Sequence, residues 1–233
     1  ISVILAIVLI AFYLVYVVLP LFRPAHIAES TEFVLPGGSD SATLHYALEE
    51  QREIGMRVTA AGEVIFFATH DGAIVERKPL TGGVSASITA FSAGDPAGGL
   101  LIAGMSNGSA ILARHVYDVS YPNDVRLIKP RLDFPLGREP IAVDSASQPL
   151  RVIGAESDDK QTTIAAATGE GRVWLVSLTQ KRKSLASKEV STVRTRAKLS
   201  LEYPATHLAV DVDQQELYAT DTQGNLYYFD ISN

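Results

Sequence analysis

The stretch that decides the fold is LLIAGMSNGSAIL, which runs from Leu100 to Leu112. Two apolar runs flank the pair Asn107-Gly108. Asparagine followed by glycine tolerates the positive φ angles that tight hairpin turns require. The small residue Gly104 stands four positions before the turn glycine. The pattern therefore predicts two antiparallel strands joined by a short turn.

Three further stretches of the chain repeat this pattern. Each has a small residue four positions before a glycine, a polar residue immediately before that glycine, and an apolar run after it. These stretches are 64–75, 163–176 and 216–229, and their turn glycines are Gly72, Gly171 and Gly224. Successive turn glycines of the four hairpins lie 36, 63 and 53 residues apart. We expect the four glycines to occupy equivalent turns in four successive sheets.

Other runs supply the remaining strands of each unit. Short apolar runs at 87–91, 150–155 and 207–211 precede three of the hairpins. The run 193–201 alternates apolar residues with basic or polar ones, which is typical of a half-buried outer strand. Each unit is therefore expected to have three or four antiparallel strands.

Irregular units of about 40–60 residues with four strands are typical of β-propeller blades. The predicted fold class is all-β and β-propeller-like, with WD40- or quinoprotein-like blades, preceded by one transmembrane α-helix. At least four blades are recognisable, and we expect the propeller to be incomplete. The alternative is a β-sandwich whose hairpins resemble one another by coincidence, because sandwiches have a similar spacing of turns.

The first 22 residues, ISVILAIVLIAFYLVYVVLPLF, contain no charged side chain. About twenty helical residues span the hydrocarbon core of a bilayer, so this stretch is predicted to be a transmembrane helix. Tyr13 and Tyr16 lie toward its C-terminal end, where aromatic rings favour the membrane boundary. A buried core helix and a cleaved signal peptide are the alternatives. The apolar run is longer than the 7–15 residues of a signal peptide, and no basic residue precedes it.

The predicted organisation is a transmembrane helix at 1–22, a linker at 23–42 and a propeller-like domain at 43–233. Because the chain begins at Ile1 and stops just after the fourth hairpin, we expect it to be a piece of a longer protein, truncated at its C-terminus. The linker carries three acidic residues against one arginine, which favours its placement outside the cytoplasm. Only 44–52 resembles a short amphipathic helix.

Composition excludes several classes of function. The net charge of −6 and the pI of about 5.4 argue against a general nucleic-acid-binding protein. The absence of cysteine excludes disulfides and thiolate metal sites. An apolar fraction of 47% with 20% charged residues is typical of a folded chain rather than a disordered one.

No catalytic, cofactor or metal site is predicted, and the chain is not expected to be an enzyme. The five histidines are scattered without metal-ligand spacing; they are His26, His45, His70, His115 and His207. Asp158-Asp159 and the pair Asp211 and Asp213 lack the glycine and glutamate of a calcium loop. The glycine-rich segment 94–99 lacks the lysine of a phosphate loop. Trp174 is expected to be a core residue.

Basic residues concentrate between Lys181 and Lys198, where the only acidic residue is Glu189. The seven basic residues are Lys181, Arg182, Lys183, Lys188, Arg194, Arg196 and Lys198. Such a patch would attract anionic lipid, a partner or an anionic solute. The alternative is a solvated loop followed by the polar face of an outer strand. No arginine cluster flanks a helix N-terminus, so we expect no tight phosphate binding, with this patch as the one exception.

The segment FYLVYVVLPLFRPA, from Phe12 to Ala25, resembles the start of an enlarged permease subunit of bacterial phosphate ABC transporters. In such subunits a soluble domain is inserted after the first membrane helix. The resemblance implies a location in the bacterial inner membrane, with the soluble domain in the periplasm or otherwise outside the cytoplasm. It also implies the membrane, a second permease, an ATPase and a binding protein as partners. The domain would serve recognition or scaffolding, and the motif transfers no functional residue.

Two other classes remain open at this stage. One is a membrane-anchored β-propeller that acts as a scaffold in an envelope protein complex. The other is an anchored propeller enzyme, such as a quinoprotein-like dehydrogenase, which needs convergent acids and aromatic groups on the central channel. Further apolar helices downstream would favour the permease, whereas an end after the last blade would favour the scaffold.

Overall fold

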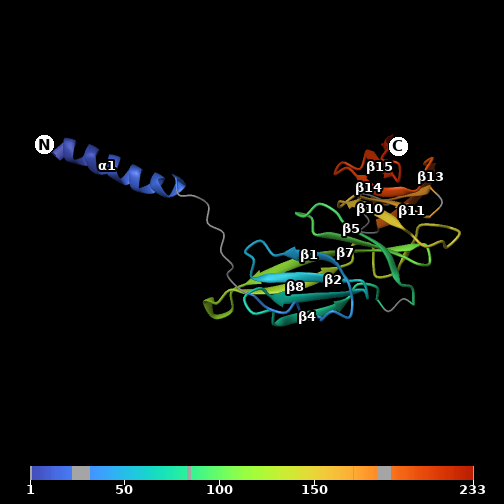
Figure 1. Cartoon of the computed structure of the whole chain (residues 1–233), viewed down its shortest axis with the longest axis horizontal. Coiled ribbons are helices and arrows are strands. Elements are labelled where there is room, and N and C mark those ends of the chain that lie inside the picture. The colour runs from blue at the N-terminus through green and yellow to red at the C-terminus, as the bar shows by residue number, and fades with distance from the viewer. Residues whose placement is uncertain (1, 23–31, 83–84, 170, 183–189, 233) are drawn as a thin grey trace. The chain divides into compact units, whose positions relative to one another are not determined.

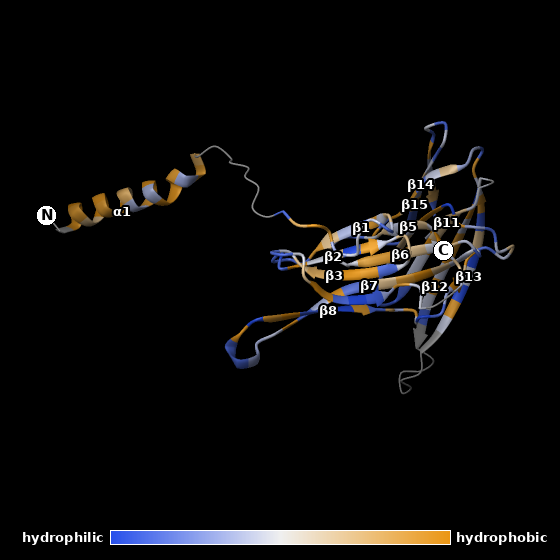
Figure 2. Cartoon of the chain, turned by 60° about the horizontal axis from the view of Figure 1, so that its bottom comes forward, coloured by the Kyte–Doolittle hydropathy of each residue, from blue (hydrophilic) through white to orange (hydrophobic). Residues whose placement is uncertain are grey.

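The computed structural model describes residues 2–22, 32–82, 85–169, 171–182 and 190–232, and the chain forms two compact units, Ile1–Phe33 and Val34–Asn233 (Figure 1). The first unit contains helix α1 (Ser2–Val18), which continues as the short 3₁₀ helix η1 (Leu19–Phe22). Every side chain from 3 to 22 is exposed. Over Val3–Phe22 the mean hydropathy is 2.9, so this helix is long and apolar enough to cross a membrane. In Figure 2 the ribbon of α1 is coloured mostly as hydrophobic residues.

The second unit is all-β, and its described residues form sixteen strands in four antiparallel sheets. Sheet 1 contains β1 (Thr43–Leu48), β2 (Ile54–Thr59), β3 (Glu63–Ala68) and β4 (Ile74–Pro79). Sheet 2 contains β5 (Ile88–Ala93), β6 (Leu100–Met105), β7 (Ser109–Ser120) and β8 (Leu127–Asp133), with β9 (Ile141–Ala142) paired to β7. Sheet 3 contains β10 (Val152–Ser157), β11 (Gln161–Ala167), β12 (Arg172–Arg182) and β13 (Val190–Ser200). Sheet 4 contains β14 (Ala205–Val210), β15 (Glu216–Asp221) and β16 (Leu226–Asp230). The 3₁₀ helix η2 (Pro122–Asp124) lies between β7 and β8.

Apart from β9, which pairs with β7, strands pair in sequence order within each sheet, as the hairpin pattern predicts. The predicted strands 87–91, 150–155 and 207–211 correspond to β5, β10 and β14. Each is the first strand of its sheet. The two-sheet sandwich is not what the structure contains, because the four hairpins belong to four separate sheets.

The four turn glycines all have positive φ, as predicted, with values of +74° at Gly72, +75° at Gly108, +70° at Gly171 and +83° at Gly224. Their predicted equivalence is wrong for the first one. Gly72 follows the third strand of its sheet, whereas the other three follow the second strand. The equivalent residue in sheet 1 is Gly62, at φ +82°. Its turn reads Ala60-Ala61-Gly62 and lacks the polar residue that precedes the other turn glycines, so the sequence pattern pointed to the next turn instead.

Consecutive sheets pack face to face, and a separate apolar core lies between each pair. The core between sheets 1 and 2 includes Met56, Phe66 and Leu101, and that between sheets 2 and 3 includes Ile102 and Ile164. The core between sheets 3 and 4 comprises Ala165, Ala167, Val173, Leu175, Leu201, Leu208, Leu217 and Ala219. The sheets are therefore stacked in the order of the chain.

Residues 34–42 cover the face of sheet 1 that does not contact sheet 2. Arg57, on β2, is only 3% exposed, and its guanidinium donates hydrogen bonds to three backbone carbonyls of this segment. The acceptors are Pro36 at 2.8 Å, Gly38 at 2.9 Å and Ser41 at 2.8 Å. We call residues 34–42 the strap. It belongs to the part of the chain whose composition suggested a linker, and residues 23–31 of that linker lie outside the described residues.

Two expectations about single segments are wrong. The stretch 44–52 is not a helix, because most of it forms β1 and the turn after it. Strand β13 is an outer strand as predicted, but it is not half-buried. Residues 192–198 are exposed on both faces, and Val193 is 40% exposed. Sheet 4 stops at its third described strand, so only the end of β13, at Leu199, reaches the core between sheets 3 and 4.

Candidate functional site

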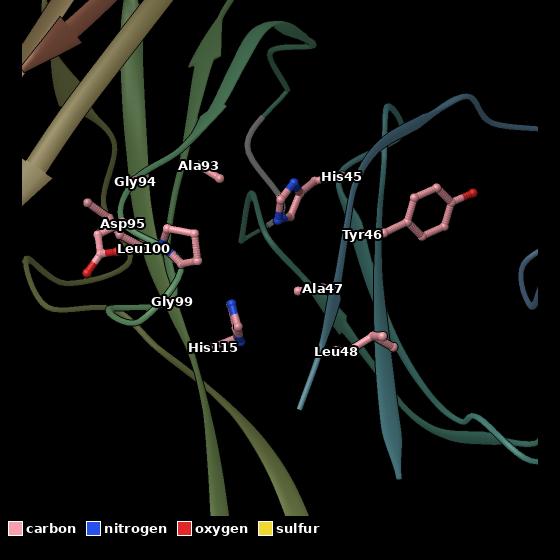
Figure 3. Close-up of a pocket in the computed structure, with 11 residues that line it drawn as sticks. His45, Tyr46, Ala47, Leu48, Ala93, Gly94, Asp95, Gly99, Leu100 and His115 are labelled. Carbon is pink, nitrogen blue, oxygen red and sulfur yellow. The ribbon is translucent and has the colours of Figure 1, made fainter. Parts of the chain in front are cut away.

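A cleft with two histidines lies where sheet 1 meets sheet 2 (Figure 3). Its volume is about 240 Å³. Strand β1 lines one side with His45 and Ala47, and the loop between β5 and β6 lines the other with residues 93–99. His115, on β7, also lines the cleft. Figure 3 shows both imidazole rings directed into the gap, whereas Tyr46 points away from it.

The alternation of β1 explains which side chains enter the cleft. His45, Ala47 and Glu49 are at least partly buried, whereas Tyr46 and Leu48 are 52% and 59% exposed. A strand directs successive side chains to opposite faces, so the first set faces sheet 2. A second cavity of about 440 Å³ continues the cleft past His115 toward Tyr117 and Glu49. The two cavities together form a groove along the junction of the sheets.

Burial controls the charge state of the groove. It lowers the pKa of His45, and it lowers the pKa of His115 with an additional contribution from the charge of His45. Both imidazoles are therefore neutral at pH 7. Burial also raises the pKa of Tyr117, and the Glu49 carboxylate adds to this effect. Tyr117 stays a phenol at any physiological pH.

One ion-paired cluster fixes the end of the groove. Arg126, which precedes β8, bonds to three side chains of the turn between β1 and β2. Its Nη1 lies 2.8 Å from Oε1 of Glu53, and its Nη2 lies 3.4 Å from Oε1 of Glu49; Gln51 accepts the third bond. Glu49 is 6% exposed, so this pair holds a buried charge. The carboxylate of Glu49 is therefore part of an ion pair that connects sheet 1 with sheet 2.

The groove offers hydrogen-bonding atoms that have no partner among the described residues. They are Nδ1 of His115 and the hydroxyl of Tyr117, both buried. Neutral imidazole and phenol can each donate or accept, so the groove suits a polar, uncharged group of a ligand or partner. Within the described residues no group of three or more histidines and acids is placed to hold a metal ion.

Of the other described histidines, His70 lies in a turn and His207 lies on β14, and the acidic pairs lie in turns. His70 lies 3.2 Å from the Asp71 carboxylate in an exposed turn, and His207 contacts Thr220 at 3.3 Å. Asp158 accepts bonds from the backbone of Lys160 and Gln161. Asp211 does the same for residues 215 and 216. These carboxylates cap turns, and His26 lies outside the described residues.

The basic patch is only partly described. Lys183, Lys188 and Glu189 lie outside the described residues, and the side chains of Lys181 and Arg182 are not described either. Arg194 and Arg196 both donate to the backbone carbonyl of Ala142, the latter at 2.9 Å. Arg196 also lies over the ring of Trp174, at 5.8 Å from its centroid. These two arginines tie the outer strand of sheet 3 to β9 of sheet 2.

Sequence reasoning missed the pairing of His45 with His115, which stand 70 positions apart without any motif. It also missed Arg57, although a lone arginine inside a six-residue buried strand is a signal that could have been used. The glycine-rich segment 94–99 forms one wall of the groove, which its composition did not indicate. Trp174 packs against the core between sheets 2 and 3, as predicted.

Comparison with known proteins gives no assignment. No family model matches the chain, and no curated protein matches it. Among solved structures, the chain is similar to the computationally designed Ika4 protein, with a TM-score of 0.47 and 11% identity over 87% of this chain and 99% of that one. It is also similar to Sqt1 from Chaetomium thermophilum, with a TM-score of 0.46 and 19% identity over 85% of this chain and 45% of that one. Neither similarity carries an argument about activity or partners.

Proposed function

We propose that this chain is the first membrane helix and the extracytoplasmic, β-propeller-like domain of an ABC transporter permease subunit for phosphate uptake. The domain serves recognition or scaffolding. The observation that carries the proposal is the union of a fully exposed apolar helix with a stack of meander sheets in one chain. The permease family, the solute and the partners come from the resemblance of residues 12–25.

The proposed propeller arrangement is supported by the first strands of the sheets. Strand β10 lies against both β5 and β14, so the first strands of sheets 2, 3 and 4 are neighbours. A cavity of about 320 Å³ lies at their ends, lined by residues 92–95, 154–156 and 208–212. Sheets that stack in chain order with their first strands together are expected to fan around one axis.

The membrane role is supported by the physical character of the helix. From residue 3 to residue 22 no side chain is buried and none is charged. Water is an unfavourable environment for such a helix, whereas the hydrocarbon core of a membrane is a favourable one. A signal sequence has the same character, so the experiment must separate the two. Membranes are isolated from cells that express the full-length protein with a tag downstream of the domain. The mass of the tagged protein in the membrane fraction is then measured. A mass that includes residues 1–22 supports a membrane anchor, and a mass that lacks them contradicts it.

The transporter role is tested by partners and by uptake. The full-length protein is purified in mild detergent, and co-purifying proteins are identified by mass spectrometry. An ATP-binding subunit and a second permease are expected, together with loss of phosphate uptake when the gene is deleted. A gene that encodes the protein without residues 34–233 should give a protein that still inserts into the membrane. Some phosphate uptake should remain, with altered regulation of that uptake. Unchanged uptake after full deletion, with envelope proteins as the partners, would favour the scaffold instead.

A further inference from the structure

The hairpin of β7 and β8 carries exposed apolar side chains at its tip. Val119, Tyr121, Val125 and Leu127 are each between 45% and 66% exposed. Single exposed apolar residues are common on soluble proteins, but these four lie within nine consecutive positions. The stretch 119–127 is therefore a candidate interaction surface, and we call it the hairpin tip.

The apolar side chains lie on both faces of the hairpin. Val119 is paired with Ile128, and Ser120 is paired with Leu127. Paired residues of antiparallel strands share a face and successive residues alternate, so Val119 and Leu127 lie on opposite faces. A protein partner that docks on one face leaves the other in water, whereas lipid surrounds a tip on both faces. The distribution of the apolar side chains therefore favours a membrane as the partner.

The hairpin tip carries little charge. Its charged residues are Asp124 and Arg126. Arg126 is ion-paired with two glutamates in the turn between β1 and β2, so its charge is balanced and the base of the hairpin is fixed against sheet 1. Pro122 has no amide donor, and its carbonyl accepts a hydrogen bond from the amide of Val125 at 3.1 Å. Few groups of the tip therefore lose a bond to water when the tip enters lipid.

The course of the strap places its first residue at the same end of the domain as the hairpin tip. In the turn between β2 and β3, the amide of Ala61 donates to Oγ of Ser41 at 2.9 Å. Gly37 lies against the side chain of Ile65, in the middle of β3. Toward Val34 the strap therefore runs to the opposite end of sheet 1, which carries the turn that is bonded to the hairpin. Figure 1 shows the hairpin, in yellow-green, projecting from that end of the domain.

The length of the connection limits how far this end of the domain can lie from a membrane. The apolar helix ends at Phe22 and the strap begins at Val34, so residues 23–33 connect them. Even a fully extended chain of that length spans at most about 40 Å. If α1 crosses a membrane, the start of the strap stays within that distance of the end of the helix. The hairpin tip belongs to the end of the domain that is tethered in this way.

We propose that the hairpin tip inserts shallowly into the interface of the membrane that α1 crosses. The partner is the bilayer itself. Val119, Tyr121, Val125 and Leu127 enter the boundary between headgroups and acyl chains, which is the favoured location of tyrosine rings. Asp124 limits the depth, because a carboxylate is unfavourable in the hydrocarbon core. The inference rests on the membrane anchor proposed above, but it does not depend on the transport role.

Fluorescence quenching by lipid tests the contact. The 233-residue chain, which has no cysteine, is reconstituted into vesicles of phosphatidylcholine and phosphatidylglycerol that include a lipid with a nitroxide on its acyl chain. Ser120→Cys carries an environment-sensitive fluorophore at the hairpin tip, and Ala61→Cys carries it in the exposed turn at the opposite end of sheet 1. The nitroxide lipid should quench the label at the tip at least about threefold more strongly than the control label. Iodide in the water should quench the control label more strongly.

Two substitutions in the labelled Ser120→Cys chain test whether the apolar side chains make the contact. Tyr121→Ser combined with Leu127→Ser changes exposed residues, so the unfolding midpoint should not change. Quenching by the nitroxide lipid should nonetheless fall to the level of the Ala61→Cys control. Leu226→Ser combined with Tyr228→Ser removes a similar pair of exposed side chains from sheet 4 and should leave the quenching at the tip unchanged.

Flotation of the vesicles separates this inference from the membrane anchor. If the chain floats but iodide quenches the tip label as strongly as the control label, the anchor stands and the hairpin contact is overturned. Protection of the tip from both quenchers would mean that protein, such as a second copy of the chain, covers it, and would also overturn the proposal. A chain that does not float would refute the anchor and this inference with it.

Discussion

Strands β6 and β15 are both second strands of their sheets, but they are buried in different ways. All six residues of β6 are buried. In β15 only Leu217, Ala219 and Asp221 are buried, and Tyr218 is 38% exposed. Strand β6 contributes Leu100 and Ile102 to one core and Leu101 and Ala103 to the next, whereas β15 contributes to a single core. A sheet with neighbours on both faces therefore needs no polar face.

The same difference separates the two end sheets of the stack. Sheet 1 has the strap over its outer face, and all six residues of β2 are buried. Sheet 4 has no such cover among the described residues, and Tyr228 is 57% exposed on β16. The hydrogen bonds of Arg57 with the strap accompany the burial of both faces of β2, although this strand belongs to an end sheet.

The largest expected effect comes from Leu101→Ala compared with Leu226→Ala. Leu101 is fully buried, and truncating such a leucine costs about 2–5 kcal/mol of unfolding free energy. Leu226 is 68% exposed, so its truncation should cost less than about 0.5 kcal/mol. Chemical denaturation followed by the fluorescence of Trp174, the single tryptophan, measures both. Equal losses of unfolding free energy in the two variants would contradict the proposed difference in burial between sheet 2 and sheet 4.

The second prediction concerns the strap. Arg57→Met removes the buried guanidinium and leaves three strap carbonyls without their donor. Because hydrogen bonds to charged groups are worth about 1.5–3 kcal/mol each, we expect a loss of about 3 kcal/mol in the local stability of sheet 1. Hydrogen exchange of the β2 amides reports this loss. Arg77→Met, whose guanidinium pairs with Glu63 on the exposed surface, is the matched control. Slow exchange at β2 in both variants would mean that the strap is not what protects sheet 1.

The third prediction compares two glycines with the same backbone conformation. Gly108→Ala and Gly224→Ala both place a Cβ at positive φ, which costs about 1–2 kcal/mol. At Gly108 the new atom would also lie 2.9 Å from Cα of Ser147, whereas at Gly224 it would meet nothing within 4 Å. Gly108→Ala should therefore be the more destabilising variant by about 1–3 kcal/mol. If the two midpoints shift equally, the loop at 144–148 does not pack against the turn.

The smallest effect is a pH dependence of the histidine groove. In the folded state the pKa values of His45 and His115 lie below their usual value, so the unfolded state takes up protons first as the pH falls. Above the unfolded pKa of about 6.5 the titration of the two residues adds no pH dependence to stability. Below it stability falls, and the fall ends once the folded pKa values are passed. His115→Gln should flatten this slope in denaturation curves recorded from pH 8 to pH 5. A slope that does not change would place the cause elsewhere.

Much of the fold was readable because it depends on local patterns. The pair Asn107-Gly108 predicted a turn, and the apolar runs on either side of it predicted the two strands. The error at Gly72 came from the same source, because Asp71-Gly72 resembles the other turns more closely than Ala61-Gly62 does. The exposure of β13 was not readable, since it depends on what sheet 4 leaves uncovered. Alternation at 193–201 shows that two faces differ, but not that a core covers either one.

The sites were less readable than the fold. His45 and His115 meet only because β1 of one sheet faces β7 of the next. Sheet stacking brings together residues that are distant in the sequence. Long-range contacts of this kind leave no spacing signal in one sequence.

The most direct test of the account is the side of the membrane on which the stacked sheets lie. These 233 residues contain no cysteine, so Asp159→Cys in an exposed turn of sheet 3 introduces one thiol into the domain, and the protein without this substitution is the labelling control. Intact cells with a permeabilised outer membrane are treated with a membrane-impermeant maleimide, and the full-length protein is then isolated. The account predicts labelling before the cells are lysed. Labelling that occurs only after lysis would place the domain in the cytoplasm and contradict the proposed extracytoplasmic role.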